Sequence, residues 1–441
     1  MRRTLLVLVL AGCLAVPVYF ALTAHRVFDT PVRTTGTGST AGVGGNTGVV
    51  GTTGTIAAAD SVDVKTKVAT RRARTTRVGK PVSFTPAVMG VMQAGTGSPM
   101  IAVGQLHTLL VKPDGTVWAW GFNDNGQLGD GTTTDSVHPI AISSLADVRN
   151  IASSNAVWAE HSLAVTGAGE VWTWGKNTQG QLGDGTTTAH ASPSSILNFS
   201  GITSAKAGEE HSIALKSDGT VWSWGANGFG QLGHDGYTNQ LTPGQVSTLT
   251  GITAIATWTA FNLALKSDGT VWGWGTDYQG ELGDGGWNTN RPTPVQTSSL
   301  TSVTAIATGG IHGLAVKSDG TVWAWGRNPN GQLGDGTYTG RTTPVQVSGV
   351  TSAIAVAGGL NHSLALKSDG TVWAWGLNSR GELGDGTTTT RNTPVQVSGL
   401  SNIVSIAAGG DFSVAVGSDG IVYGWGANSK GQIGDWTTVD R

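Results

Sequence analysis

One pattern, Val-Trp-x-Trp-Gly or a close variant, recurs along this chain at intervals of about 50 residues. Its seven aromatic pairs are Trp118/Trp120, Trp172/Trp174, Trp222/Trp224, Trp272/Trp274, Trp323/Trp325, Trp373/Trp375 and Tyr423/Trp425. Self-similarity at this period is typical of propellers, solenoids and other repeat arrays. The repetition therefore limits the fold to an assembly of seven similar units.

A single unit, residues 303–349, contains four short segments with the alternating polarity of β-strands. Their sequences are VTAIAT, HGLAVK, TVWAW and TPVQVS. The pair Asp319 and Gly320, between the second and third segments, is typical of a tight hairpin turn. No helical period occurs in the unit. We therefore expect an all-β protein, a seven-bladed β-propeller with four antiparallel strands per blade.

The side chains of these strands predict how the blades stack. In the third strand both aromatics point to one side, and the residue between them is always small. In the second strand of the third unit, the bulky Ile213 and Leu215 alternate with the small Ser212 and Ala214. We expect each sheet to have one thick and one thin face, with thick packed on thin around the ring. The Trp side chains of the repeat would then form the core.

The last blade needs a fourth strand from elsewhere in the chain. The seventh unit ends at GDWTTVDR, before any segment like those that form the fourth strand of the other units. The sequence FTPAVM at 84–89 resembles NTPVQV at 392–397. We expect residues 84–89, with Thr85–Met89 as the strand, to complete the last blade and remove exposed sheet edges.

The first 80 residues differ from the repeats in composition. Residues 1–24 place two arginines before an apolar run, which is the layout of a signal peptide or membrane anchor. Lipidation of Cys13, which ends a Leu-Ala-Gly-Cys sequence, is a further alternative. Residues 25–80 form a Gly/Thr-rich and then basic linker, and residues 81–441 form the propeller. We expect an extracytoplasmic protein, secreted or tethered to the membrane by its N-terminal segment.

Charge divides the chain in the same place. Residues 1–80 hold 11 Lys/Arg and 3 Asp/Glu, a net charge of +8, whereas residues 81–441 hold 15 and 25, a net charge of −10. An acidic folded part argues against nucleic-acid binding, which needs a basic face. The single Cys lies in the leader, so the repeats have no disulfide and no Cys-based metal site. We further expect a monomer without a cofactor.

Two recurrent polar positions fit packing better than chemistry. A His starts the second strand in five units and Phe replaces it in two, so we expect buried structural side chains rather than ligands or bases. These residues are His107, His161, His211, His312, His362, Phe261 and Phe412. The Asp of the Gly-Asp-Gly loops is expected to cap a turn, with calcium binding as the alternative. These residues are Asp130, Asp184, Asp284, Asp335 and Asp385.

The phrases HSIALKSDGTVWSWGANGFGQLG and HSLALKSDGTVWAWGLNSRGELGDGTTTTRNTPVQV closely resemble the regulator of chromosome condensation repeat family. The resemblance covers residues 81–441 and all seven repeats, and it implies a seven-bladed propeller. The eukaryotic founder of that family is a nuclear guanine-nucleotide exchange factor that also docks on chromatin. Its exchange residues lie in face loops, and none of them is assigned to a position in this sequence. A looser resemblance to a secreted bacterial propeller that inhibits β-lactamase implies protein binding by the same architecture.

Departures from the repeated phrase concentrate in loops that the alternating strand directions place on one face of the ring. The candidate binding residues of this face are Phe229, Tyr237, Trp258, Tyr278, Trp287, Tyr338, Glu209 and Glu210, interleaved with Asp277 and Glu281. Tyr and Trp are the residues most often found at binding hot spots, although local loop packing also explains loop aromatics. We expect a non-enzymatic scaffold that binds a protein or a cell-envelope glycan. The alternatives are an exchange-factor-like regulator of a small GTPase and a hydrolase or lyase that uses loop carboxylates.

Overall fold

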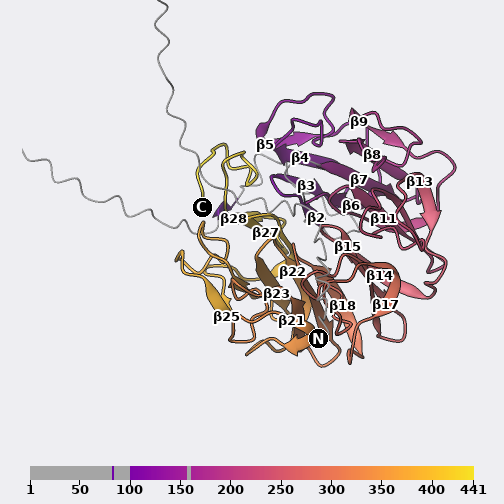
Figure 1. Ribbon diagram of the computed structural model, residues 1–441. Coiled ribbons are helices and arrows are strands. Elements are labelled where there is room, and N and C mark those ends of the chain that lie inside the picture. Colours follow the sequence, from indigo (N-terminus) through magenta and orange to yellow (C-terminus); the bar gives the residue numbers. More distant parts are fainter. Residues whose placement is uncertain (1–81, 84–99, 156–159) are drawn as a thin grey trace, which may run out of the picture. The chain divides into compact units, whose positions relative to one another are not determined.

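The computed structural model describes residues 82–83, 100–155 and 160–441, all of which belong to one compact unit, Ala73–Arg441. Its strands form seven four-stranded antiparallel sheets that follow one another around a common axis (Figure 1). The seven-bladed propeller expected from the repeats is confirmed. Within the described ranges the chain has no helix, and hence none long and apolar enough to cross a membrane. The leader 1–24, Cys13 and the linker 25–80 lie outside the described residues.

Six sheets run from an inner strand to an outer strand in chain order, and the seventh runs from β26 through β27 and β28 to β1 (Val82–Ser83), the first strand of the chain. The inner strands are β2 (Met100–Val103), β6 (Val148–Ser153), β10 (Ile202–Ala207), β14 (Ile252–Thr257), β18 (Val303–Thr308), β22 (Ala353–Gly358) and β26 (Ile403–Ala408). The second strands are β3 (His107–Val111), β7 (His161–Thr166), β11 (His211–Lys216), β15 (Phe261–Lys266), β19 (His312–Lys317), β23 (His362–Lys367) and β27 (Phe412–Gly417).

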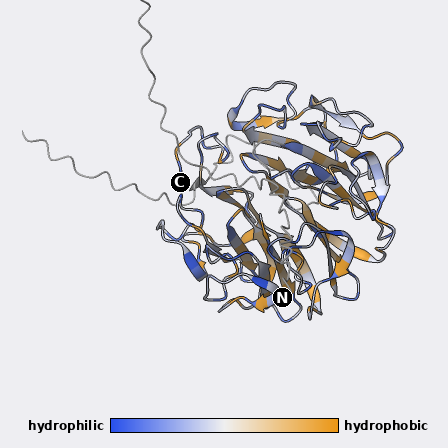
Figure 2. Ribbon diagram, in the orientation of Figure 1, coloured by the Kyte–Doolittle hydropathy of each residue, from blue (hydrophilic) through white to orange (hydrophobic). Residues whose placement is uncertain are grey.

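The third strands carry the aromatic pairs: β4 (Val117–Gly121), β8 (Val171–Gly175), β12 (Val221–Gly225), β16 (Val271–Gly275), β20 (Val322–Gly326), β24 (Val372–Gly376) and β28 (Val422–Gly426). Six outer strands follow them in sequence: β5 (Ser136–Ala141), β9 (His190–Ser195), β13 (Gln240–Gln245), β17 (Arg291–Gln296), β21 (Arg341–Gln346) and β25 (Arg391–Gln396). Figure 2 shows apolar residues distributed through all the sheets, as expected when every sheet packs on both faces.

The pairing of β11 with β12 corrects the predicted stacking in one respect. Ser212 lies opposite Trp224 and Ala214 opposite Trp222, so the small residues of β11 share a face with the aromatic pair of β12. Residues directly opposite in a sheet project to the same side. Each face therefore combines one bulky strand with one small strand, and the prediction of a wholly thick and a wholly thin face is wrong.

The hydrophobic clusters lie between successive sheets. Ala119 of β4 packs with Trp174 of β8, so a small residue of one sheet receives the indole of the next. The ring closes in the same way, because Trp120 shares a cluster with Phe412 and Val414 of the last sheet. The second aromatic of each pair is at most 1% exposed: Trp120, Trp174, Trp224, Trp274, Trp325, Trp375 and Trp425. Burial of one such side chain stabilises the fold by roughly 5 kcal/mol as an upper bound.

The first aromatic of each pair is only half-buried, so the core prediction holds for one Trp of the two. In five sheets a Lys ammonium lies over its ring; Lys112 Nζ is 4.1 Å from the ring centroid of Trp118, and Lys216 Nζ is 4.4 Å from that of Trp222. Such cation–π contacts contribute about 0.5–1 kcal/mol at exposed sites. In these five blades the first Trp of the pair is therefore partly covered by a lysine side chain.

The last sheet takes its outer strand from both ends of the compact unit. β1 (Val82–Ser83) pairs with β28, with Val82 opposite Gly424. Arg441 and Gly426 exchange two backbone hydrogen bonds of 2.8 and 2.9 Å, in the place where Arg391 pairs with Gly376 in the preceding sheet. Val82 of β1 pairs with Gly424 as Val395 of β25 pairs with Ala374. The sequence Pro-Val-Ser at 81–83 accordingly resembles the Pro-Val-Gln segment of the other outer strands. The predicted closing segment 84–89 lies outside the described residues.

Candidate functional site

The loops between third and outer strands are built on a buried Asn. In the second blade the side-chain oxygen of Asn177 accepts a hydrogen bond from the Leu182 N–H (3.0 Å). Its amide group donates to Asp184 Oδ1 (3.2 Å) and to the Thr188 carbonyl (3.0 Å). The equivalent residues Asn123, Asn328 and Asn378 make the same set of bonds. Each loop is therefore pre-organised, which lowers the entropy that binding would cost.

The Asp of the Gly-Asp-Gly loops caps a turn, as expected. The Thr186 N–H donates to Asp184 Oδ1 (2.9 Å), and the same contact forms at Asp130, Asp335 and Asp385, with a glycine N–H as the donor at Asp284. In later blades the other carboxylate oxygen accepts two bonds from an Arg, as Asp335 does from Arg341 (3.1 and 2.9 Å). In the described part of the chain, no group of three or more His, Cys, Asp or Glu could hold a metal ion.

Five aromatic side chains, the loop aromatics, project from the loops of the third, fourth and fifth blades. Tyr237, Trp287 and Tyr338 occupy one loop position, where the other four blades have Thr, and they are 54%, 63% and 55% exposed. Phe229 and Tyr278 come from neighbouring blades and are also exposed. Their rings meet edge to face with centroids 6.3 Å apart. These five side chains are open to solvent, and their role in binding stays a prediction.

Three members of the predicted face are buried instead. Trp258 directly follows the inner strand β14. Its side chain lines the central cavity and is only 2% exposed. Asp277 takes the place of the loop Asn, and Glu281 takes the place of a buried Gln that accepts a local backbone hydrogen bond. Of the remaining two, Glu209 is exposed, and the half-buried Glu210 forms a 3.5 Å ion pair with Lys176.

Asp277 is the unusual member of the Asn series. Its Oδ1 accepts the Leu282 N–H (3.1 Å), whereas its Oδ2 is buried without a hydrogen-bond partner among the described residues. Burial, together with the nearby carboxylates Asp284 and Glu281, raises the pKa of Asp277 to about 7. The protonated acid resembles Asn in having one acceptor and one donor, so the loop that carries Trp287 tolerates this residue best in its neutral form.

The histidines of the second strands join adjacent blades, which confirms that they are buried structural residues. His161 Nε2 is hydrogen-bonded to Ser212 Oγ of the next blade (2.8 Å), and that hydroxyl donates to the Gln181 carbonyl (2.9 Å). The indole N–H of Trp224 donates to the same carbonyl (2.9 Å). Burial lowers the pKa of His211 to about 4, of His312 to about 3 and of His362 to about 4, so these rings are neutral at pH 7.

The partner of each His is the second residue of the second strand in the next blade, as Ser212 is for His161, so the contact can be looked for in the sequence. Where Phe261 replaces His, the next blade has Gly313 in the position of the serine, so both halves of the contact are absent together. His107, by contrast, has an extended version. Its Nε2 lies 2.6 Å from Ser153 Oγ, and its Nδ1 lies 3.2 Å from Glu160 Oε2.

The connectivity Ser153–His107–Glu160 is that of a nucleophile, base and orienting carboxylate. The His–hydroxyl contact recurs without the carboxylate, however, as in the 3.3 Å separation of His211 Nε2 and Thr257 Oγ1. Glu160 also accepts the backbone N–H of Leu106 (3.2 Å), which ties together two turns of adjacent blades. We therefore interpret the chain of three residues as a junction between blades.

One exposed aromatic escaped the sequence argument. Trp436 is 57% exposed and stands where five other blades have the glycine that follows the loop Asp, with φ at 66°. Its ring stacks on His138 of the first blade, with centroids 4.1 Å apart and planes 3° from parallel. The change from GDG to GDW was visible in the sequence, but the partner was not, because the two residues meet only across the closed ring.

Seven four-stranded sheets that close through a core of repeated indoles define a repeat-built β-propeller. The chain belongs to the RCC1-like domain family, since the family model described as "RCC1-like domain" matches residues 159–441. A second model, "Regulator of chromosome condensation (RCC1) repeat", matches residues 114–165. The family resemblance drawn from the repeats is thereby confirmed.

Similarity to curated proteins is local. The ultraviolet-B receptor UVR8 of Arabidopsis thaliana is 37% identical over 118 residues, which cover 27% of this chain and 26% of the receptor. Human protein RCC2 is 40% identical over 92 residues, which cover 21% of this chain and 17% of RCC2. The matched stretches thus span about a quarter of these relatives or less.

Similarity to solved structures extends over most of the propeller. Human WBSCR16 is 26% identical with a TM-score of 0.64, covering 74% of this chain and 85% of that one. Prp20p from Saccharomyces cerevisiae is 25% identical with a TM-score of 0.64, covering 73% and 83%, and its structure is described together with its binding to Gsp1p and histones.

Proposed function

We propose that this protein is a non-catalytic, extracytoplasmic interaction scaffold whose loop aromatics bind a protein partner. The observation that carries the proposal is the placement of Tyr237, Trp287 and Tyr338 at one loop position in three successive blades, each more than half exposed. A fold that buries one indole per blade gains nothing from leaving these rings in water. Exposed aromatics on rigid loops are typical of binding hot spots.

The family supports protein binding as the general activity, because the yeast relative Prp20p is described with protein partners. The acidic Glu209 and Glu210 lie at turns on the same face, which favours a partner with a basic rim. A glycan would use the same aromatic faces, and it is the second ligand class to be tested.

The test replaces each loop aromatic by the residue that other blades use at that position. The triple variant Tyr237→Thr, Trp287→Thr, Tyr338→Thr places at this exposed position the residue of the other four blades, so we expect an unchanged melting temperature. Capture from a cell-envelope extract should lose its specific protein bands. Trp436→Gly, which restores the glycine of other blades, is the matched control and should retain them. Equal capture by the triple variant and the wild type would contradict the proposal, and loss of glycan-array binding alone would assign a glycan ligand.

The extracytoplasmic location rests on the arginines and apolar run of residues 1–24. Fusing residues 1–80 to alkaline phosphatase, which is active only after export, tests it directly. A leader without its apolar run serves as the control. Phosphatase activity equal to that of the control would place the propeller in the cytoplasm.

The similarity to Prp20p makes an exchange-factor-like regulator the second candidate. Such a protein must reach a cytoplasmic or nuclear GTPase, so it requires the opposite outcome of the fusion experiment. A retained reporter, together with accelerated release of labelled GDP from a small GTPase, would favour this function over the scaffold.

A further inference from the structure

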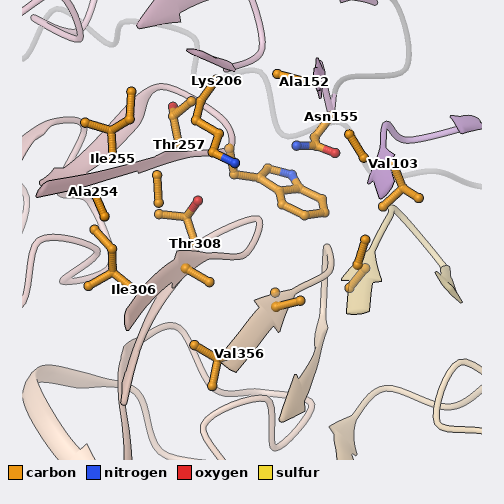
Figure 3. A pocket seen from close by; sticks show the side chains of 18 of the residues that line it. Val103, Ala152, Asn155, Lys206, Ala254, Ile255, Thr257, Ile306, Thr308 and Val356 are labelled. Carbon is orange, nitrogen blue, oxygen red and sulfur yellow. The ribbon is translucent and has the colours of Figure 1, made fainter. Parts of the chain in front are cut away.

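The inner strands of all seven blades line a central cavity of about 440 Å³. Its wall is formed mainly by Ala, Ile, Val and Thr side chains, such as Ile255, Ile306 and Val356 (Figure 3). Lys206 is the one charged side chain among the described residues of the wall. In the view of Figure 3, Lys206 and Asn155 extend toward the same part of the cavity.

Two neighbouring blades depart from the repeat at this place. Lys206 stands where the other six inner strands have Ala, namely Ala102, Ala152, Ala256, Ala307, Ala357 and Ala407. Trp258, which directly follows the inner strand of the next blade, stands where five others have Gly. A backbone hydrogen bond from the Glu209 N–H to the Thr259 carbonyl (3.0 Å) joins the two turns beside them. Blade packing does not require Lys206 or Trp258, because other blades pack with Ala at the first position and Gly at the second.

Two polar side-chain atoms on the cavity wall lack partners among the described residues. Trp258 is 2% exposed, and its indole Nε1 is buried without a hydrogen bond. The side-chain oxygen of Asn155 is buried and unpaired as well. Burial lowers the pKa of Lys206, and no carboxylate lies among the described residues of the wall to compensate it. Buried donors are normally satisfied, so the unpaired indole N–H of Trp258 marks a place for an acceptor. The partly exposed Lys206 lines the same cavity and adds a positive charge.

We propose that the cavity is a binding site for a carboxylate that carries an apolar body. The Lys206 ammonium and the Trp258 N–H would hold the two oxygens, the Asn155 side-chain NH₂ group would donate to the same carboxylate, and the aliphatic wall would enclose the rest. One cation balances one negative charge, whereas a phosphate dianion would need more donors than this wall supplies. The shared chemistry fits a free small acid or the C-terminal residue of a peptide. The site is separate from the loop aromatics and does not depend on them.

The experiment uses the full chain and hexanoate as the probe, with 1-hexanol as the neutral probe of matched length. Protein labelled with ¹⁵N-tryptophan reports the Trp258 indole N–H, whose resonance is assigned by its absence from Trp258→Phe. We expect hexanoate, but not hexanol, to shift this resonance and to give a saturable titration by calorimetry. Lys206→Ala restores the residue of the other blades and should fold normally, yet weaken hexanoate binding at least about tenfold.

Two comparisons complete the test. Trp258→Phe keeps an aromatic ring but loses the donor, and it should weaken hexanoate binding about three- to tenfold. Lys317→Ala, which removes a lysine outside the cavity, should leave the affinity unchanged. Equal binding of hexanol, equal affinity of Lys206→Ala, or no shift of the Trp258 resonance would each overturn the proposal.

The source of the carboxylate is distinguished by the peptide Ala-Ala-Ala-Leu with a free or an amidated C-terminus. Stronger binding of the free peptide than of hexanoate, lost on amidation, supports recognition of a chain end. Binding of hexanoate without binding of either peptide supports a free small acid.

Discussion

The substitution Asp277→Asn should remove a pH-dependent weakness from the fourth blade. Asp277 occupies the position of the loop Asn but presents a buried, unpaired Oδ2 where Asn presents a donor. Its pKa in the folded protein is raised to about 7 from an ordinary value of 3.8. A raised folded-state pKa means that the stabilising form is the protonated one. Its contribution is therefore complete below the unfolded pKa and is lost as the pH rises through about 7.

The magnitude follows from the two pKa values. At pH 5, two units below the folded pKa, protonation of Asp277 stabilises the folded state by about 2.7 kcal/mol, and by pH 8 this contribution is close to zero. Asn carries no such dependence. The stability difference between Asp277→Asn and the wild type should therefore grow by about 2.7 kcal/mol from pH 5 to pH 8. Other groups with raised pKa values, such as Glu382, are present in both proteins and cancel.

Denaturant unfolding of both proteins at pH 5 and pH 8, followed by tryptophan fluorescence, measures this difference. The reverse change Asn378→Asp places the same carboxyl in the sixth blade and should introduce the pH dependence that Asp277→Asn removes. A stability difference between Asp277→Asn and wild type that is equal at pH 5 and pH 8 would refute the reasoning.

Three further outcomes are expected. Burial raises the pKa of Glu382 to about 7 at a position where five blades have Gln, so Glu382→Gln should stabilise the protein more at pH 8 than at pH 5, measured by denaturant midpoints. Ser212→Ala removes the hydroxyl shared by His161 and the Gln181 carbonyl and should cost about 1–3 kcal/mol of unfolding free energy, whereas the exposed Thr187→Ala should cost almost nothing. A chain that begins at residue 84 should melt well below one that begins at residue 73, because only the first lacks β1; equal melting temperatures would contradict closure by β1.

The architecture was predictable because one phrase is written seven times. A period of about 50 residues, an Asp-Gly hairpin and alternating polarity are enough to define four-stranded blades. The stacking was predictable only in part, since alternation within β11 or β12 does not reveal which residues lie opposite. The register of Ser212 with Trp224 decides that, and register depends on the hairpin as a whole.

The candidate site was also predictable only in part. Tyr237, Trp287 and Tyr338 could be found because they stand at a loop position where the other four blades have Thr. Trp258 also departs from its repeat, but its departure is at a strand end that faces the axis. The residue type alone does not tell an exposed loop aromatic from the buried Trp258, because exposure depends on where the segment lies relative to the propeller axis. Lys206 was passed over for the opposite reason: a single Lys in a strand reads as an ordinary surface residue until the strand is known to be innermost.

The outer strand of the last blade, shared between Val82–Ser83 and Arg441, also has a mechanical consequence. Any pull transmitted along the chain from residues before Val82 enters the ring at a two-residue strand rather than at one of the six continuous outer strands. Release of β1 would leave Tyr423 and Gly424 of β28 without their outer partners, while Arg441 still pairs with Gly426 and the other six blades keep their outer strands. In a propeller anchored through its N-terminal segment, a pulling force would therefore act first on the short pairing of β1 with β28.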